Sequence, residues 1–266
     1  MTTIAITGSA SGIGAAAREI LEAGGSEVIG IDLRGAEIVA DLSTPEGREK
    51  AISETLERTD ESLDGLVTAA GIGPPNDPHK ILSVNCFGTL TLLEGLREAL
   101  AISEGIAKVV AISSNSTTTV PDIPAELVAM CLAGDEQGAL DLLDGYGEAA
   151  QNYAYAGGKT AVARFVRRNA PTEAWAGSGI RLNAIAPGAT LTPLLQAGLD
   201  SDEFGPMIKA FPVPTGGFGT PHQIAAWIAH MMSEDADFLC GSVIFVDGGS
   251  DAIVRPDSWP DTYEMQ

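Results

Sequence analysis

The stretch TIAITGSASGIG, residues 3–14, decides the fold of this chain of 266 residues. Its first five residues predict a strand, and a helix is predicted over residues 14–23, where two glycines end it. Between them, Gly8, Gly12 and Gly14 permit a tight turn, close approach of a pyrophosphate to the backbone, and close packing of helix on strand. Free N–H groups at the helix start attract an anion without a lysine. This strand–turn–helix context therefore predicts a phosphate cradle.

Short apolar strands alternate with helices along almost the whole chain. Further strands are predicted at 28–32, 66–70, 108–113, 180–185 and 242–246, and further helices at 45–58, 81–100, 155–169 and 221–232. Continuous apolar strands separated by helices indicate a parallel sheet that is covered on both faces. Because no Pro/Ser-rich linker or internal repeat divides the sequence, we predict one α/β domain over residues 1–266, a doubly wound parallel sheet of the Rossmann type.

Asp32 is the last residue of the second predicted strand and follows Gly12 by 20 positions. At this spacing a carboxylate can accept hydrogen bonds from both hydroxyl groups of an adenosine ribose. The same charge would repel a 2′-phosphate. The sequence therefore predicts NAD rather than NADP as the cofactor.

Tyr155 and Lys159 are four residues apart in a predicted helix, so both side chains project from one face. A free phenol has a pKa near ~10. An ammonium group ~5–6 Å away, at an effective dielectric of about 20, would lower that pKa by about two units. Tyr155 would then act as a general base toward an alcohol, or as a general acid toward a ketone, near neutral pH.

Two segments interrupt the alternation of strands and helices. Residues 115–150 contain seven acidic side chains and no basic one, and their apolar residues recur at helical spacing on both sides of Gly134, so we predict an inserted helical pair with one apolar stripe. Residues 193–220 are rich in Pro and Gly but carry several large apolar side chains. Such a loop is consistent with a substrate lid, and the alternative is a surface excursion packed on the core.

The composition argues against several classes of partner. Acidic residues outnumber basic ones 36 to 15, a formal charge of −21, and this surface would repel nucleic acid and anionic membranes. No apolar run approaches the ~20 residues that span a bilayer, and the first residues carry no basic start of a signal peptide. Three scattered cysteines and three scattered histidines predict neither disulfides nor a metal site. We expect a cytoplasmic protein.

A series of motifs in a fixed order resembles the short-chain dehydrogenase/reductase family over nearly the full chain. The motifs are TGSASGIG (7–14), Asp41-Leu42, Ala69-Ala70-Gly71, Asn85 in NCFG, Ser114 closing AISS, YAGGK (155–159), Pro187-Gly188 and VDGG (246–249). The resemblance implies that Ser114 holds and polarises the substrate oxygen and that Tyr155 transfers the proton. It implies that Lys159 binds the nicotinamide ribose and lowers the tyrosine pKa, and that Asn85 fixes a water in a proton relay to that lysine.

The same resemblance implies an NAD-binding site. Asp41 and Leu42 would meet the adenine, Ala70 and Gly71 would pass beside the adenosine ribose, and residues 187–192 would contact the carboxamide. The full set of expected cofactor residues is Gly8, Ser11, Gly12, Ile13, Gly14, Asp32, Asp41, Leu42, Ala70, Gly71, Tyr155, Lys159, Pro187, Gly188, Thr190 and Thr192.

Two departures from the family pattern stand out. The usual NNAG motif is replaced by TAAG at 68–71, which keeps the small residues and loses the asparagines. Ser114 and Tyr155 are separated by 40 positions, where the family usually has about a dozen. The insertion lies beside helices through which these proteins commonly form tetramers, so we predict a homodimer that uses another face.

Within the family, several stretches are similar to the bacterial 3α-hydroxysteroid dehydrogenase/carbonyl reductase group. They include VIGIDLRGAEIVADLSTPEGR (28–48), APGATLTPLLQAGL (186–199), the insertion, and DAIVRP (251–256). This implies NAD(H)-dependent oxidation of a 3α-hydroxyl on a steroid and reduction of other hydrophobic carbonyl compounds. Two alternatives stay open: a coniferyl-type aryl alcohol dehydrogenase, and a catalytically silent NAD sensor on the same fold.

Overall fold

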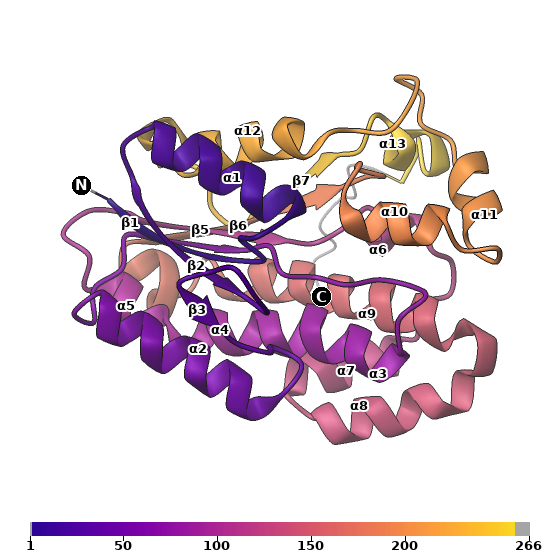
Figure 1. Cartoon of the computed structure of the whole chain (residues 1–266), viewed down its shortest axis with the longest axis horizontal. Coiled ribbons are helices and arrows are strands. Elements are labelled where there is room, and N and C mark those ends of the chain that lie inside the picture. The colour runs from indigo at the N-terminus through magenta and orange to yellow at the C-terminus, as the bar shows by residue number, and fades with distance from the viewer. Residues whose placement is uncertain (1, 259–266) are drawn as a thin grey trace, which may run out of the picture.

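The computed structural model describes residues 2–258, so Met1 and the last residues of the predicted 1–266 domain lie outside the described part. A seven-stranded, wholly parallel sheet forms its centre, with the strands in the order β3-β2-β1-β4-β5-β6-β7 (Figure 1). The strands are β1 (Thr3–Thr7), β2 (Glu27–Asp32), β3 (Ile38–Val39), β4 (Gly65–Thr68), β5 (Ala107–Ile112), β6 (Ile180–Pro187) and β7 (Val243–Val246). Strand order reverses between β1 and β4, which is the ligand-binding position of doubly wound folds.

Helices cover both faces of the sheet, as the strand patterns predict. One face carries α1 (Gly12–Ala23) and α12 (Pro221–Met231), seen above the sheet in Figure 1. The other face carries α2 (Pro45–Arg58), α4 (Thr89–Gly95), α5 (Arg97–Ala101) and α9 (Ala150–Asn169). Alternate residues of β1 serve the two layers: Ile4 and Ile6 pack with α1 and α12, and Ala5 faces the cluster that contains α4 and α9. The predicted doubly wound α/β fold is confirmed.

The predicted continuous helix over 81–100 is wrong. The segment comprises α3 (Pro78–Leu82), a π-helical turn η1 (Ser83–Gly88), α4 and α5. The side chain of Asn85 lies inside η1 and hydrogen-bonds the backbone of Ile72, which precedes α3 in the chain. This tie accompanies the change of helical hydrogen bonding at Asn85, and such turns are common at functional sites. The two-residue strand β3 was also not predicted.

The insertion forms helices, as its apolar spacing predicts. It contains α6 (Ser116–Thr119), α7 (Ala125–Ala133), α8 (Glu136–Leu143) and a 3-10 turn η2 (Asp144–Ala149), and Gly134 ends α7 with a left-handed φ of 75°. Leu127, Cys131 and Leu143 are buried against side chains of α3, η1 and α9. The insertion therefore covers the outer face of these helices (Figure 1).

The segment at 193–220 contains two short helices, α10 (Pro193–Leu199) and α11 (Gly205–Ala210), at the right-hand end of Figure 1. A parallel bridge between Thr190 and Gly219 brings the two ends of this loop together. Leu195 and Phe204 are buried, whereas Met207 is 62% exposed. The loop thus has its own packing and still presents apolar surface.

Three short helical segments complete the described chain: η3 (Glu173–Gly177), η4 (Glu234–Ala236) and α13 (Ser250–Val254). Between residues 2 and 258, no helix combines the length and the apolar character needed to cross a membrane.

Candidate active site

The candidate residues meet at the carboxyl edge of the sheet. Each of the first six strands delivers at least one of them where it ends or in the connection that follows: Gly8 to Gly14 after β1, Asp32 in β2, Asp41 and Leu42 after β3, Ala70 and Gly71 after β4, Ser114 after β5, and Pro187 to Thr192 from β6. Helix α9 adds Tyr155 and Lys159, and η1 adds Asn85. A parallel sheet brings these points to one edge although they are spread over most of the chain.

The glycine-rich turn is shaped by close backbone approaches. Gly8 and Gly12 have φ values of +68° and +56°, which side chains rarely adopt. A methyl group on Gly8 would lie 2.8 Å from the backbone nitrogen of Ala70, and one on Gly14 would overlap the carbonyl oxygen of Gly8. Within the described residues, no side chain caps the start of α1 and its first turn has no acidic residue. Its N–H groups therefore fit a pyrophosphate.

Asp32 is fixed against this turn. Its Oδ2 accepts a hydrogen bond from the backbone N–H of Ala10 at 3.0 Å, and its Oδ1 accepts one from Leu33 N–H at 2.7 Å. The carboxylate thus lies at the end of β2, beside the phosphate cradle. This is the position in which it would meet the adenosine ribose.

Ser114 and Tyr155 are brought together across the insertion. The Ser114 side chain lies close enough to the Tyr155 phenol to affect its pKa, and Ser114 Oγ accepts a hydrogen bond from the backbone N–H of Ser116 at 3.1 Å. Burial raises the pKa of Tyr155 above the ordinary value of a phenol, and the interaction with the Ser114 side chain opposes that rise. The serine hydroxyl and the phenol form one polar pair.

Lys159 is almost fully buried, at 3% exposure, and its Nζ donates to the backbone carbonyl of Ile112 at 2.7 Å. Desolvation lowers the pKa of Lys159 to about 8. The expected net lowering of the Tyr155 pKa is not found among the protein's own groups, because burial of the phenol raises the pKa and Ser114 is the group that opposes the rise. Helical spacing placed both residues on one face, but it specified neither the direction of Nζ nor the loss of solvent.

Asn85 lies beside Lys159, with Gly71 between them. A methyl group on Gly71 would be 2.9 Å from Asn85 Oδ1 and 3.6 Å from Lys159 Nζ. Both polar atoms of the Asn85 amide bind the backbone of Ile72: Oδ1 accepts from its N–H at 3.0 Å, and Nδ2 donates to its carbonyl at 2.7 Å. The amide therefore fixes the chain between β4 and α3.

The segment after β6 reaches both the cradle and the tyrosine. A methyl group on Gly12 would lie 3.3 Å from Thr192 Cγ2, so Thr192 lies against the glycine-rich turn. A methyl group on Gly73 would lie 3.3 Å from Leu194 and 3.7 Å from the Tyr155 ring. The start of α10 is therefore next to the residue expected to transfer the proton.

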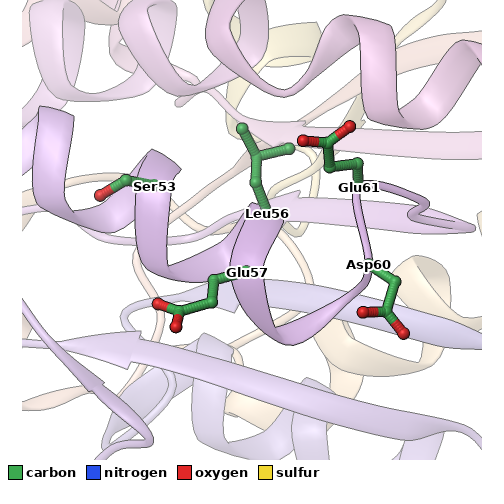
Figure 2. Close-up of a pocket in the computed structure, with 5 residues that line it drawn as sticks. All are labelled: Ser53, Leu56, Glu57, Asp60 and Glu61. Atoms are coloured by element: carbon green, nitrogen blue, oxygen red, sulfur yellow. The ribbon is translucent and has the colours of Figure 1, made fainter.

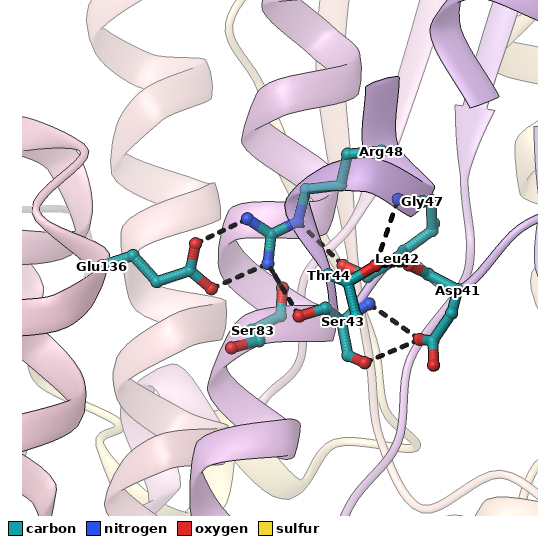
Figure 3. Close-up of polar contacts among 8 residues, drawn as sticks. All are labelled: Asp41, Leu42, Ser43, Thr44, Gly47, Arg48, Ser83 and Glu136. Atoms are coloured by element: carbon teal, nitrogen blue, oxygen red, sulfur yellow. Dashed lines mark hydrogen bonds and ion pairs between the residues drawn. The ribbon is translucent and has the colours of Figure 1, made fainter. Parts of the chain in front are cut away.

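An ion pair near the site, between a buried arginine and a partly buried glutamate, was not predicted. Arg48 of α2 and Glu136 of α8 form a two-pronged ion pair beside Asp41 and Leu42 (Figure 3). Arg48 ends the stretch 28–48, which resembles the family, but no local pattern marks its partner, which is 88 residues away.

One depression on the described part of the surface lies away from the candidate residues. The depression in Figure 2, lined by Ser53, Leu56, Glu57, Asp60 and Glu61, lies at the C-terminal end of α2. Because α2 runs from the carboxyl edge of the sheet back to the amino edge, this depression lies opposite the site. Among residues 2–258, no group of three or more His, Cys, Asp or Glu side chains could hold a metal ion.

Known proteins are similar to this chain in sequence and in fold. The sequence model described as enoyl-(acyl carrier protein) reductase matches residues 142–251. The 3-alpha-hydroxysteroid dehydrogenase/carbonyl reductase of Comamonas testosteroni is 44% identical over 257 residues, which are 96% of this chain and 99% of that protein. The chain belongs to the short-chain dehydrogenase/reductase family. The resemblance expected from the motifs is confirmed, and the protein is an oxidoreductase of that family.

Two further members place the chain within the family. The crystal structure of the 3-alpha-hydroxysteroid dehydrogenase from Pseudomonas sp. B-0831 complexed with NADH has a TM-score of 0.91 and 44% sequence identity, and the match covers 97% of this chain and 100% of that one. The coniferyl-alcohol dehydrogenase of Pseudomonas sp. strain HR199 is 29% identical over 260 residues, which are 92% of this chain and 95% of that protein.

Proposed function

We propose that this protein is an NAD(H)-dependent oxidoreductase that transfers hydride between nicotinamide and a 3α-hydroxysteroid or another hydrophobic alcohol or ketone. The observation that carries the proposal is that Ser114, directly after β5, and Tyr155 of α9 lie together at the carboxyl edge of the sheet. It occurs in a chain that is 44% identical, over 96% of its length, to a 3-alpha-hydroxysteroid dehydrogenase/carbonyl reductase.

In this proposal Ser114 and Tyr155 share the substrate oxygen. The serine hydroxyl holds and polarises that oxygen, and Tyr155 gives a proton to a ketone or removes one from an alcohol. The raised pKa of the phenol keeps it protonated at neutral pH, which suits the reductive direction. In the oxidative direction, the positive charge of the oxidised nicotinamide ring would stabilise the phenolate.

The expected cofactor residues fit a dinucleotide with a free 2′-hydroxyl. Gly8, Ser11, Gly12, Ile13 and Gly14 would hold the pyrophosphate, and Asp32 would bind the adenosine ribose. When bound, the cofactor supplies the hydride donor or acceptor, and its oxidised ring carries a positive charge. Asp41, Leu42, Ala70 and Gly71 would line the adenosine end, and Pro187, Gly188, Thr190 and Thr192 the carboxamide end.

Lys159 and Asn85 would support proton exchange behind the tyrosine. With a pKa of about 8, the Lys159 ammonium can release a proton near neutral pH, and it would also bind the nicotinamide ribose. The Asn85 amide binds Ile72 through one N–H and one lone pair, which leaves a second N–H and a second lone pair available for a water. In the relay Asn85 would fix that water and also hold the backbone near Lys159.

An apolar substrate fits the loop at 193–220, which we propose is a lid. Leu194 lies beside the tyrosine, and Leu191 and Met207 are large apolar side chains with about half or more of their surface exposed. A rigid hydrocarbon skeleton would cover such side chains and gain roughly 25 cal/mol per Å² of apolar surface removed from water. The higher identity to the steroid enzyme than to the coniferyl-alcohol enzyme favours a steroid.

We also propose a cytoplasmic homodimer. All three cysteines carry free thiols, which suits a reducing compartment. The insertion covers α3 and α9, so the dimer would use another face. Trp227 of α12 is 43% exposed and Phe238, between η4 and β7, is fully exposed, and the edge strand β7 follows directly. Sedimentation of Phe238→Asp as a monomer, with the unchanged chain as a dimer, would support this face.

The experiment that tests the function is a substrate panel with each nicotinamide cofactor. Rates of cofactor reduction are measured with androsterone-type 3α-hydroxysteroids and with coniferyl-type alcohols, using NAD⁺ and NADP⁺. We expect oxidation of the steroids with NAD⁺. Faster turnover of the aryl alcohols would favour the alternative dehydrogenase, and no turnover of any substrate would favour a silent NAD sensor. A marked preference for NADP⁺ would contradict the role given to Asp32.

A further inference from the structure

Arg48 joins three parts of the chain from a buried position. Its Nε donates to the carbonyl of Leu42 at 2.8 Å, and its Nη2 donates to the carbonyls of Ser43 and Ser83, each at 3.3 Å (Figure 3). Its two terminal nitrogens bind the two carboxylate oxygens of Glu136 at 2.6 and 2.7 Å. The guanidinium therefore links the segment after β3, the turn η1 and the insertion.

Glu136 is the first residue of α8, at the edge of the insertion that faces α2. Burial by itself would raise the pKa of its carboxyl group, but hydrogen bonds from Arg48 and from the Ser83 side chain outweigh burial and lower it. The carboxylate is thus charged at neutral pH. It compensates a guanidinium that is only 4% exposed, and a planar two-pronged pair of this kind fixes orientation as well as charge.

The segment held by Arg48 is a tight turn with little freedom of its own. Asp41 Oδ1 accepts from the backbone N–H and the hydroxyl of Ser43 at 2.9 and 2.7 Å. Thr44 caps α2 by accepting from Gly47 N–H at 3.1 Å. Arg48 binds the carbonyls of Leu42 and Ser43 from the opposite side, so its position decides where this turn lies relative to the sheet edge.

We propose that Arg48 and Glu136 are a positioning pair through which the insertion sets the affinity for the adenine end of the dinucleotide. The inference rests on the proposed function, in which Asp41 and Leu42 contact the adenine. Neither member of the pair touches the cofactor in this account. Arg48 orients the turn, and Glu136 orients Arg48.

The geometry gives the pair a role distinct from general stability. The tight turn is held from within by Asp41 and Thr44, so loss of Glu136 leaves its internal bonds in place. The guanidinium then lacks its partner, and a buried cation without a counter-charge moves toward water or toward other acceptors. The carbonyls of Leu42 and Ser43 move with it. We therefore expect the largest defect at the adenine end, because Ser83, the other residue that Arg48 contacts, lies in the helical turn η1, whose Asn85 is held separately by Ile72.

The first test compares Glu136→Gln with Asp144→Asn. Both changes replace an acid of the insertion that pairs with the body of the protein, but Asp144 binds exposed His79 at 2.7 Å and lies away from Arg48. Direct binding of NADH and of its hypoxanthine analogue, which lacks the adenine amino group, is measured by fluorescence. We expect Glu136→Gln to weaken NADH binding about fivefold or more and to reduce the preference for NADH over the analogue. Asp144→Asn should change neither value.

Steady-state kinetics supply a second readout. In Glu136→Gln, the KM for NAD⁺ should rise while kcat at saturating NAD⁺ and the KM for the alcohol stay within about twofold, because Ser114 and Tyr155 are not displaced. An unchanged NADH affinity in folded Glu136→Gln would overturn the inference. So would an equal loss of affinity for the alcohol.

A double variant separates positioning from folding. Arg48→Leu with Glu136→Leu removes both charges, and its stability should recover relative to Arg48→Leu alone, while NADH binding stays weak. Recovery of NADH binding together with stability would show a purely structural pair and would overturn the inference.

Asp41→Ala separates the placement of the adenine, which belongs to the proposed function, from the positioning role of Arg48 and Glu136. If it leaves NADH affinity unchanged, the placement of the adenine is wrong and the inference falls with it. If it weakens NADH binding while Glu136→Gln does not, only the positioning role fails.

Discussion

Lys159 and Arg48 are two buried cations in different regions of the molecule, and the protein treats their charges in opposite ways. They are almost equally buried, at 3% and 4% exposure. Lys159 donates to the neutral carbonyl of Ile112, and desolvation lowers its pKa to about 8. The Arg48 guanidinium donates hydrogen bonds to the carboxylate of Glu136 and to three backbone carbonyls. One charge is left free to change near neutral pH, and the other is fixed in place.

This difference separates a chemical role from a positional one. A group that exchanges protons needs a pKa near the working pH, and desolvation without a carboxylate partner provides it. A group that holds a backbone turn needs a permanent charge and a rigid shape, which a guanidinium paired with a carboxylate provides. Replacing Arg48 should therefore lower the free energy of unfolding, whereas replacing Lys159 should raise it.

The largest effect is expected at Arg48. Replacing it by Leu leaves the Glu136 carboxylate and several buried carbonyls without their partner, so the free energy of unfolding should fall by about 3–5 kcal/mol. Urea denaturation followed by circular dichroism measures this change. A loss below about 1 kcal/mol would show that the pair holds nothing in place and would remove the contrast with Lys159.

A smaller effect of opposite sign is expected at Lys159. The shift of its pKa from 10.5 to about 8 corresponds to roughly 3 kcal/mol of unfavourable burial at pH 7. Lys159→Met removes the desolvated ammonium charge and also its hydrogen bond to Ile112. We therefore expect the free energy of unfolding to rise by about 2 kcal/mol at pH 7. Turnover should be lost.

The pH dependence of that gain has a definite sign. Between pH 8 and 10.5 the unfolded lysine holds a proton that the folded lysine has released, so the stability of the unchanged protein rises with pH in this window. The advantage of Lys159→Met should therefore be largest below pH 8 and should shrink as the pH rises toward 10.5. Denaturation curves of the unchanged protein and of Lys159→Met, recorded at neutral and at alkaline pH, measure this advantage. Titration of the groups that both proteins share cancels in the difference. A constant or growing advantage would contradict the low pKa.

The smallest effect is expected at the exposed pair of His79 and Asp144, which joins the insertion to the body of the protein as Arg48 and Glu136 do. Asp144 is 68% exposed, so water screens the interaction. Asp144→Asn should change the unfolding free energy by less than about 0.5 kcal/mol. A change comparable to that of Arg48→Leu would mean that burial does not distinguish the two pairs.

The sequence predicted the features that depend on neighbours along the chain. The glycine-rich turn, the helix at 45–58 and the helical pair around Gly134 each follow from a few adjacent residues, and the structure contains them. The doubly wound sheet follows because the strands are continuous apolar runs. The spacing of Tyr155 and Lys159 likewise placed both on α9.

What the sequence could not predict depends on residues far apart in the chain. The helix at 81–100 is interrupted where Asn85 binds Ile72 across a loop, and apolar periodicity does not reveal that contact. Arg48 and Glu136 meet only after the insertion packs on α3 and α9. The pKa values of Tyr155 and Lys159 depend on how deeply each group is buried. The spacing of the two residues does not show that burial, and a single average dielectric constant does not describe it.

Tyr155→Phe tests the central claim most directly, because it removes the phenol oxygen and keeps the ring. With NAD⁺ and a 3α-hydroxysteroid, we predict that kcat falls by at least about a thousandfold while the Kd for NADH, measured by fluorescence, stays within about twofold. A variant that still oxidises the steroid at a comparable rate would show that another group transfers the proton and would contradict the account.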